Sequence, residues 1–139
     1  TQLQVSIVRQ VDIQVVIDRM GDAMHALATA TLTPVDERRS AAVGRLTGLA
    51  YTLKTPDLGA QVHEITKNSY EAGARWLRTF DESELPMPAD VLVRVLHALI
   101  EGLVLQRILT PELCPDEVFF EAFAALAPER AKRSARSIG

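Results

Sequence analysis

The polar residues that could do chemistry gather on one face of a helix predicted over residues 89–109. An imidazole and a carboxylate one helical turn apart, as in His97 and Glu101, suit a divalent metal ion or general acid–base catalysis. Two side chains do not complete a metal site, so we favour a polar stripe that faces solvent or an interface, with contact to a small ligand as the alternative. The stripe spans an arc of about 60° and consists of Asp90, Arg94, His97 and Glu101.

The rest of the sequence contains none of the common catalytic motifs. We find no nucleophile elbow, no glycine-rich phosphate loop and no zinc-binding H-E-x-x-H motif. Cys114 is the only cysteine, so nothing indicates a disulfide framework or an oxidising compartment, and we expect a cytoplasmic protein. We therefore predict no catalytic residue, no metal and no cofactor. An enzyme that uses His97 and Glu101 stays a lesser hypothesis.

The composition is that of one ordinary globular domain. Of the 139 residues, 47% are hydrophobic and 24% are charged. The net charge of −3 offers no attraction to nucleic acid or to an anionic membrane, so we expect neither to be bound by these residues. We predict one domain over residues 1–128 and a basic, frayed tail over residues 129–139. Because the chain starts at Thr1 and not at a methionine, we expect a piece of a longer protein, and we find no signal peptide in it.

Three Thr-Pro pairs divide the sequence into helical segments. The pairs begin at Thr33, Thr55 and Thr110, and in each the threonine hydroxyl could cap a helix that starts at the proline. Between the pairs apolar residues recur every three or four positions, which predicts an all-α bundle of about five to six helices. The predicted helices cover the chain up to the first pair and then residues 35–53, 57–80, 89–109 and 115–127, with an acidic loop over residues 81–88.

The last two predicted helices carry more apolar surface than a one-sided surface helix. The helix over residues 89–109 is apolar nearly all round its first half, so we expect protein to bury it on several sides; its charged residues argue against a membrane span. Three of the four phenylalanines fall in the last helix, where so wide an aromatic face is hard to cover inside one core. We therefore predict a homodimer built on these two helices, with contacts from Val95, Ala98, Gly102, Leu105, Phe119, Phe120, Phe123 and Leu126.

Other residues suit a small-molecule cavity. Tyr70 and Trp76 each combine an apolar ring with one polar group, and Met20 and Met24 are flexible enough to line an adaptable pocket. Core packing explains the same residues as well, so both interpretations stay open. We expect an enclosed cavity on the order of a few hundred Å³ with a mainly apolar lining. The predicted ligand contacts are Met20, Met24, Leu49, Thr66, Tyr70, Trp76, Leu96 and Ile100.

Two glycines lie one turn apart inside the helix predicted over residues 35–53. Gly44 and Gly48 each cost about 1 kcal/mol relative to alanine at such positions, so something should compensate. Close approach of another helix is the favoured explanation, and room for a ligand is the alternative. Ala98 and Gly102 repeat the same spacing in the helix over residues 89–109, where they would let a second helix come near.

The segment Ala98–Leu113 resembles the penultimate helix of TetR-family (tetracycline-repressor-like) transcriptional regulators. There an acidic residue followed by Gly-Leu, with a glutamine a few positions on, often precedes a turn and a final helix. Glu101-Gly102-Leu103 and Gln106 match this pattern. The order of helices is similar too, with a short break at Leu53–Gly59 and then a long helix that ends in an acidic loop, so the resemblance covers about residues 35–126.

The resemblance implies an effector-binding and dimerisation domain. In the family the last two helices of each chain form a four-helix dimer interface, and the earlier helices enclose a small-molecule cavity. A helix-turn-helix domain precedes them, and nothing of that kind precedes Thr1. We therefore expect a regulator of the repressor type whose mostly apolar effector shifts the first long helix, so that the absent domain releases operator DNA. A helical protein-interaction module without a small ligand is the alternative.

Overall fold

The computed structural model describes residues 2–127, with side chains from Arg19 onward; the predicted tail over residues 129–139 lies outside this range. Helices and short turns make up the described chain, which contains no strand, and this confirms the all-α prediction. Two 3-10 turns, Glu82–Glu84 and Pro111–Leu113, lie in the connections before and after the fourth helix. The helices are α1 (Gln2–Glu37), α2 (Arg39–Leu53), α3 (Pro56–Leu77), α4 (Ala89–Leu109) and α5 (Asp116–Ala124).

Two of the three Thr-Pro pairs mark helix boundaries as predicted, and the first does not. α3 begins at Pro56, and α4 ends just before Thr110. α1 instead continues through Pro34, and the break comes at Arg38. A proline in the last turn removes only one backbone hydrogen bond, and the residue after it, Val35, is buried. The packing of that turn therefore outweighs the tendency of the proline to end the helix.

The threonine hydroxyls at these boundaries do not cap the following helices. The Thr55 hydroxyl donates to the backbone carbonyl of Tyr51 at 3.0 Å, and the Thr110 hydroxyl donates to that of Gln106 at 3.2 Å. Both bonds run back by four residues into the preceding helix. The hydroxyls thus satisfy carbonyls at the ends of α2 and α4, and the predicted capping of the next helix is wrong at these two sites.

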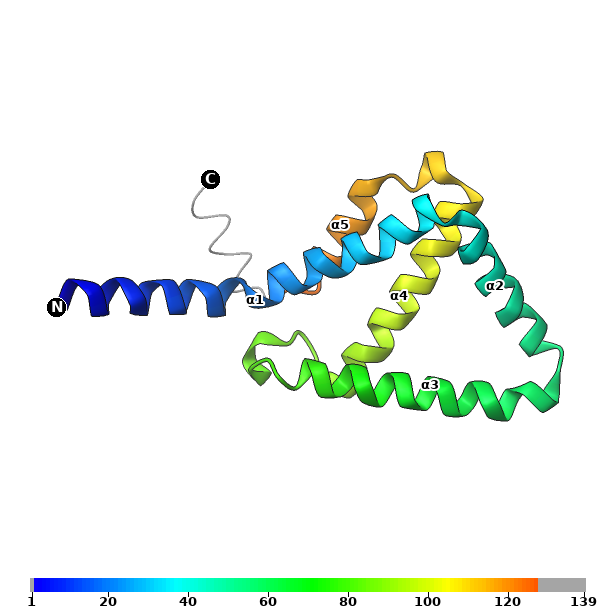
Figure 1. The fold of residues 1–139 in the computed structure, drawn as a ribbon, viewed down its shortest axis with the longest axis horizontal. Coiled ribbons are helices and arrows are strands. Elements are labelled where there is room, and N and C mark those ends of the chain that lie inside the picture. Colours follow the sequence, from blue (N-terminus) through cyan, green and yellow to red (C-terminus); the bar gives the residue numbers. More distant parts are fainter. Residues whose placement is uncertain (1, 128–139) are drawn as a thin grey trace.

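Helices α2, α3 and α4 form the three sides of a triangle (Figure 1). The second half of α3 packs on the first half of α4, and α2 connects the start of α3 to the end of α1. The C-terminal half of α1 lies beside α5, whereas its N-terminal half projects beyond the other helices (Figure 1). Because α4 contacts α1, α2 and α3, a displacement of α4 would change its packing against all three helices.

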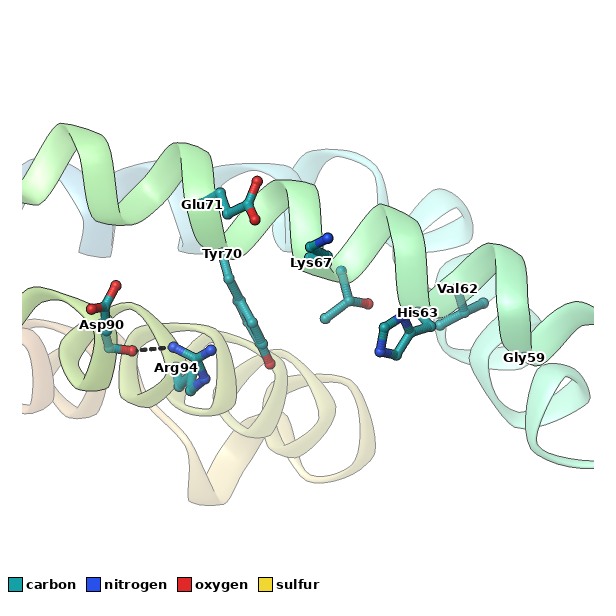
Figure 2. A pocket seen from close by; sticks show the side chains of 9 residues that line it. Gly59, Val62, His63, Lys67, Tyr70, Glu71, Asp90 and Arg94 are labelled. Atoms are coloured by element: carbon teal, nitrogen blue, oxygen red, sulfur yellow. Dashed lines mark hydrogen bonds between the residues drawn. The ribbon is translucent and has the colours of Figure 1, made fainter.

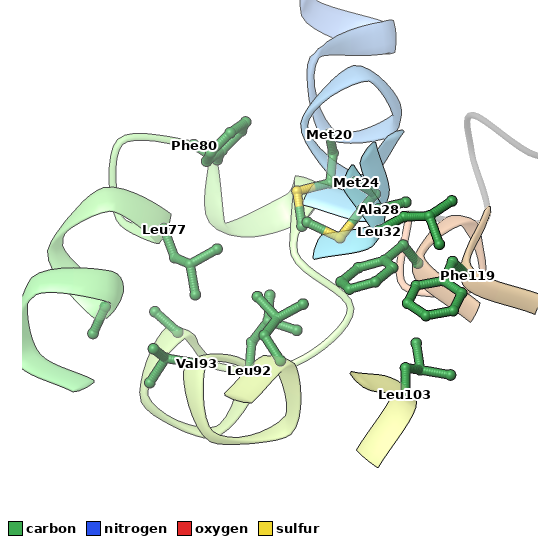
Figure 3. Packing of buried hydrophobic residues seen from close by; sticks show 14 of the residues in the cluster. Met20, Met24, Ala28, Leu32, Leu77, Phe80, Leu92, Val93, Leu103 and Phe119 are labelled. Carbon is green, nitrogen blue, oxygen red and sulfur yellow. The ribbon is translucent and has the colours of Figure 1, made fainter. Parts of the chain in front are cut away.

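The core lies where α1 and α5 meet the buried face of α4 (Figure 3). Met20 and Met24 of α1 are fully buried there, as are Leu77 of α3 and Leu92 of α4. Unbranched methionine side chains adapt to the irregular space between crossing helices, so core packing is the interpretation that holds for this pair. The other buried members of the cluster are Ala28, Leu32, Ala74, Phe80, Ala89, Val93, Leu96, Leu103, Cys114, Phe119 and Phe123.

The aromatic face of α5 is covered within the chain. Phe119 and Phe123 are 0% exposed, since α1 runs along α5 and packs against it. Phe120 is half-buried, with its ring stacked on that of His25 at a centroid distance of 4.9 Å, and Leu126 packs against the same core. The prediction that Phe119 and Phe123 contact a second chain is therefore wrong, because a helix of the same chain removes them from water.

A close helix contact occurs at Gly73, where α3 meets α4. A Cβ atom on Gly73 would lie 2.5 Å from Cγ2 of Val93, which real side chains do not tolerate. Gly44 and Gly48 of α2 have open space around them instead, because no described atom lies within 4 Å of a Cβ built on either. The predicted helix contact at that pair is therefore wrong within the described chain, and α2 contains no buried residue at all.

One arginine joins the corner where α1, α4 and α5 meet. Arg107 of α4 donates to the two carboxylate oxygens of Asp36 at 3.2 and 3.0 Å, and to Oδ1 of Asp116 at 2.8 Å. It also donates to the backbone carbonyl of Cys114 at 2.8 Å. The hydrogen bond to Asp36, with a smaller contribution from Asp116, raises the pKa of Arg107 above its usual value against the opposing effect of burial.

Candidate functional site

A groove of about 600 Å³ lies between α3 and the first turns of α4 (Figure 2). Side chains of α3 form one wall because positions that repeat every three or four residues share one face of a helix. The first two turns of α4 form the other wall. The lining residues are Gly59, Val62, His63, Thr66, Lys67, Tyr70, Glu71, Asp90 and Arg94.

Tyr70 crosses from α3 toward α4 at the middle of this groove (Figure 2). Its ring stands edge-on to the His97 ring, with 5.0 Å between the centroids. The guanidinium carbon of Arg94 lies 4.8 Å from the centroid of the Tyr70 ring, and the same guanidinium donates a hydrogen bond to the backbone carbonyl of Asp90. These contacts place an arginine over an aromatic ring in the wall of the groove.

The charges that line the groove are unevenly neutralised. Asp90 binds Arg78, which lies outside the groove, at 2.6 Å. Glu71 points away from α4 (Figure 2). Lys67 has no hydrogen bond or ion pair with any described residue, and Arg94 binds only a backbone carbonyl and the Tyr70 ring there. Two cations therefore line the groove without a carboxylate partner among the described residues.

A second groove of about 510 Å³ lies among α1, α2 and α4. Arg38 and Arg45 are its charged members, and Arg45 donates to Glu101 of α4 at 3.1 Å. α4 thus borders one groove with its first turns and the other with its middle. The remaining lining is mainly apolar and consists of Leu27, Ala30, Thr31, Pro34, Val35, Ala41, Ala42, Ile100 and Val104.

His97 and Glu101 do not act on each other. Glu101 binds Arg45, whereas Nδ1 of His97 lies 2.9 Å from the backbone carbonyl of Val93 and its ring packs on Tyr70. Among the described residues no three histidine, cysteine or acidic side chains are grouped as metal ligands would be. The polar stripe that the sequence predicts along α4 therefore contacts α2 and α3.

The eight predicted ligand contacts do not form one cavity. Thr66 and Tyr70 line the α3–α4 groove, and Ile100 lines the second groove. The other five residues line neither of these two grooves. Met20, Met24 and Leu96 are buried core residues, Leu49 is half-buried in α2, and the exposed Trp76 packs edge-on against Phe80.

Sequence reasoning also missed the charged part of the groove. Lys67 and Arg94 line it, although most of its lining surface is apolar. His63, Lys67 and Tyr70 recur at steps of four and three, which was the available signal. A charged helix face usually indicates contact with solvent, however. Only the position of α4 beside α3 turns this face into the wall of a groove.

A separate apolar stripe runs along the surface of α4. Its members recur at steps of four and three, and Val91, Leu105 and Leu109 are 49%, 39% and 64% exposed. On a helical wheel this stripe lies opposite the core face of α4. A Cβ on Gly102, near the middle of the stripe, would meet no described atom within 4 Å. The stripe consists of Val91, Val95, Ala98, Gly102, Leu105 and Leu109, so this face of α4 is not covered within the described chain.

Comparison with known proteins adds no relative. No family model, no curated protein and no solved structure matches this chain. None of the helices in the described part of the chain is both long and apolar enough to cross a membrane. The two grooves and the stripe of α4 are therefore the features from which a function can be inferred.

Proposed function

We propose that this chain is the effector-binding and dimerisation domain of a transcriptional regulator of the TetR type. The observation that carries the proposal is the division of α4 into three faces. One face packs in the core, the second lines the groove with α3, and the third is the bare apolar stripe. A single helix thus connects a site for a small molecule with a surface for a partner.

A second copy of the same stripe is the partner that fits best. Gly102 lowers the stability of α4 by about 1 kcal/mol relative to alanine, yet no described residue uses the space beside it. Small residues at this spacing let two helices approach closely, and the larger side chains at both ends of the stripe would pack around such a crossing. A two-fold axis through the centre pairs each stripe with itself, as symmetric dimers require. The interface would then use Val95, Ala98, Gly102 and Leu105, without the aromatic residues of α5.

Ligand and partner would be coupled through α4 and α1. An effector in the α3–α4 groove favours the arrangement of α4 that it binds more tightly, and by linkage it shifts the elements that α4 contacts. One of these is α1, whose N-terminal half projects beyond the other helices (Figure 1). In this proposal α1 passes the shift to a helix-turn-helix domain outside these residues, which binds operator DNA in the cytoplasm and represses transcription. The net charge of −3 is consistent with leaving DNA contacts to another domain.

Sedimentation velocity tests the proposal at tens of micromolar protein. The wild-type chain should sediment with twice the 15.3 kDa mass of one chain. Leu105→Glu places a charge in the stripe without disturbing the core, so it should yield a folded monomer by circular dichroism. The matched control is Leu53→Glu, because Leu53 is 89% exposed at the end of α2 and lies away from the stripe. This variant should remain dimeric.

Two results would count against the proposal. A wild-type monomer at these concentrations would favour the alternative, a helical interaction module that recruits a different partner through the same stripe. A Leu105→Glu variant that stays dimeric would place the interface elsewhere on the molecule.

A further inference from the structure

The charges of the α3–α4 groove indicate the chemical class of its ligand. Lys67 and Arg94 line the groove without a carboxylate partner among the described residues. Of the two acids in the lining, Asp90 is neutralised by Arg78 from outside, which leaves Glu71 as one unpaired carboxylate against these two cations. The unmatched charge in the groove is therefore positive, although the chain as a whole is acidic.

The groove also has an apolar part of fitting size. Val62 is half-buried in the wall, and Gly59 leaves open space at one end because no described atom lies within 4 Å of a Cβ built there. The ring of Tyr70 crosses the middle of the groove, next to Arg94 (Figure 2). A volume of about 600 Å³ suits a ligand with one or two rings or a short alkyl chain.

We propose that the α3–α4 groove binds an amphipathic organic anion, with its carboxylate or sulfonate between Lys67 and Arg94 and its apolar body along Tyr70 and Val62. Arg94 is suited to this role because its stacking on Tyr70 and its bond to the Asp90 carbonyl fix the guanidinium before the ligand arrives. Lys67 adds a mobile ammonium group from the opposite wall. This inference rests on the proposed function, and it replaces the mostly apolar effector that the sequence predicts.

Two fluorescent probes test the ligand class. Anilinonaphthalene sulfonate carries a sulfonate, and phenyl-naphthylamine has the same rings without a charge. The sulfonate should bind the wild-type protein more tightly than the neutral probe, and rising salt should weaken only the sulfonate. In the double variant Lys67→Gln/Arg94→Gln the affinity for the sulfonate should fall by about tenfold, while that for the neutral probe should change less than about twofold.

The matched control neutralises the same residue types away from the groove. The double variant Lys54→Gln/Arg75→Gln removes one exposed charge at the end of α2 and one on α3, and neither residue lines the groove. The affinity for both probes should stay unchanged in this variant. Equal affinities for the two probes, or an unchanged affinity for the sulfonate in the groove variant, would overturn the anion assignment.

A blocking variant separates this inference from the proposed function. Thr66→Trp fills the middle of the groove and should abolish binding of both probes. One outcome is that Thr66→Trp blocks the neutral probe while the wild-type protein binds the sulfonate no more tightly than the neutral probe. The groove would then be a ligand site, as the proposed function requires, but not an anion site. If Thr66→Trp blocks neither probe, no ligand occupies the groove, and the effector site of the proposed function fails together with the anion assignment. Circular dichroism and dimer mass confirm that each variant is folded.

Discussion

At the scale of single residues, Arg107 has the largest set of polar contacts in the described chain. Its side chain is 16% exposed and binds Asp36, Asp116 and the backbone of Cys114. Hydrogen bonds that involve charged groups and are shielded from water are stronger than those of exposed pairs. The Arg78–Asp90 pair has side chains 53% and 67% exposed, so solvent screens it. The corner of α1, α4 and α5 therefore depends on one guanidinium.

Replacement of this arginine should destabilise the fold. Arg107→Ala removes these hydrogen bonds and is expected to lower the free energy of unfolding by about 2 kcal/mol. Arg78→Ala, the matched control, should change it by less than about 0.5 kcal/mol because its pair is exposed. Urea denaturation followed by circular dichroism measures both. Equal losses in the two variants would show that Arg107 is no more than another surface ion pair.

At the scale of helices, the predicted segments agree with the structure where local signals decide. The start of α3 at Pro56 follows from the conformation of proline, and the helical spacing over residues 89–109 gives α4. The continuation of α1 through Pro34 depends on the burial of Val35, and the burial of Phe119 depends on α1 lying along α5. These are contacts between distant segments, so spacing along the chain does not contain them. The cations of the groove cannot be identified from spacing either, because they line a groove only once α4 packs beside α3.

The glycines provide an element-scale prediction. Gly44 and Gly48 lie in open space on α2, so alanine at either site should raise the free energy of unfolding by up to about 1 kcal/mol through helix propensity. Gly73→Ala should lower it by about 1 to 2 kcal/mol, since the new Cβ would lie 2.5 Å from the buried Val93 side chain. Thermal and urea unfolding compare the three variants. A destabilised Gly44→Ala would mean that α2 packs against something in solution, which its open surroundings do not predict.

At the scale of the whole molecule, α4 is the element that relates ligand, partner and core. It forms a side of the triangle of helices, borders both grooves and contacts α1. Small and large apolar residues alternate at helical spacing along its outward stripe, and no described element covers them. If the α4 helix of a second chain covers this stripe, the α3–α4 grooves of the two chains lie on either side of the interface. An effector could then change the angle between two chains as well as the position of α1.

Disulfide cross-linking at the centre of the stripe tests this account most directly. Ala98→Cys and Gly102→Cys, made separately, place a thiol where two α4 helices should come closest, whereas the native Cys114 is buried. Ala72→Cys, on the exposed surface of α3, is the matched control. The account predicts that mild oxidation converts at least one of the two stripe variants to a covalent dimer much faster than the control. Equal rates at all three positions, or no dimer from either stripe variant, would contradict it.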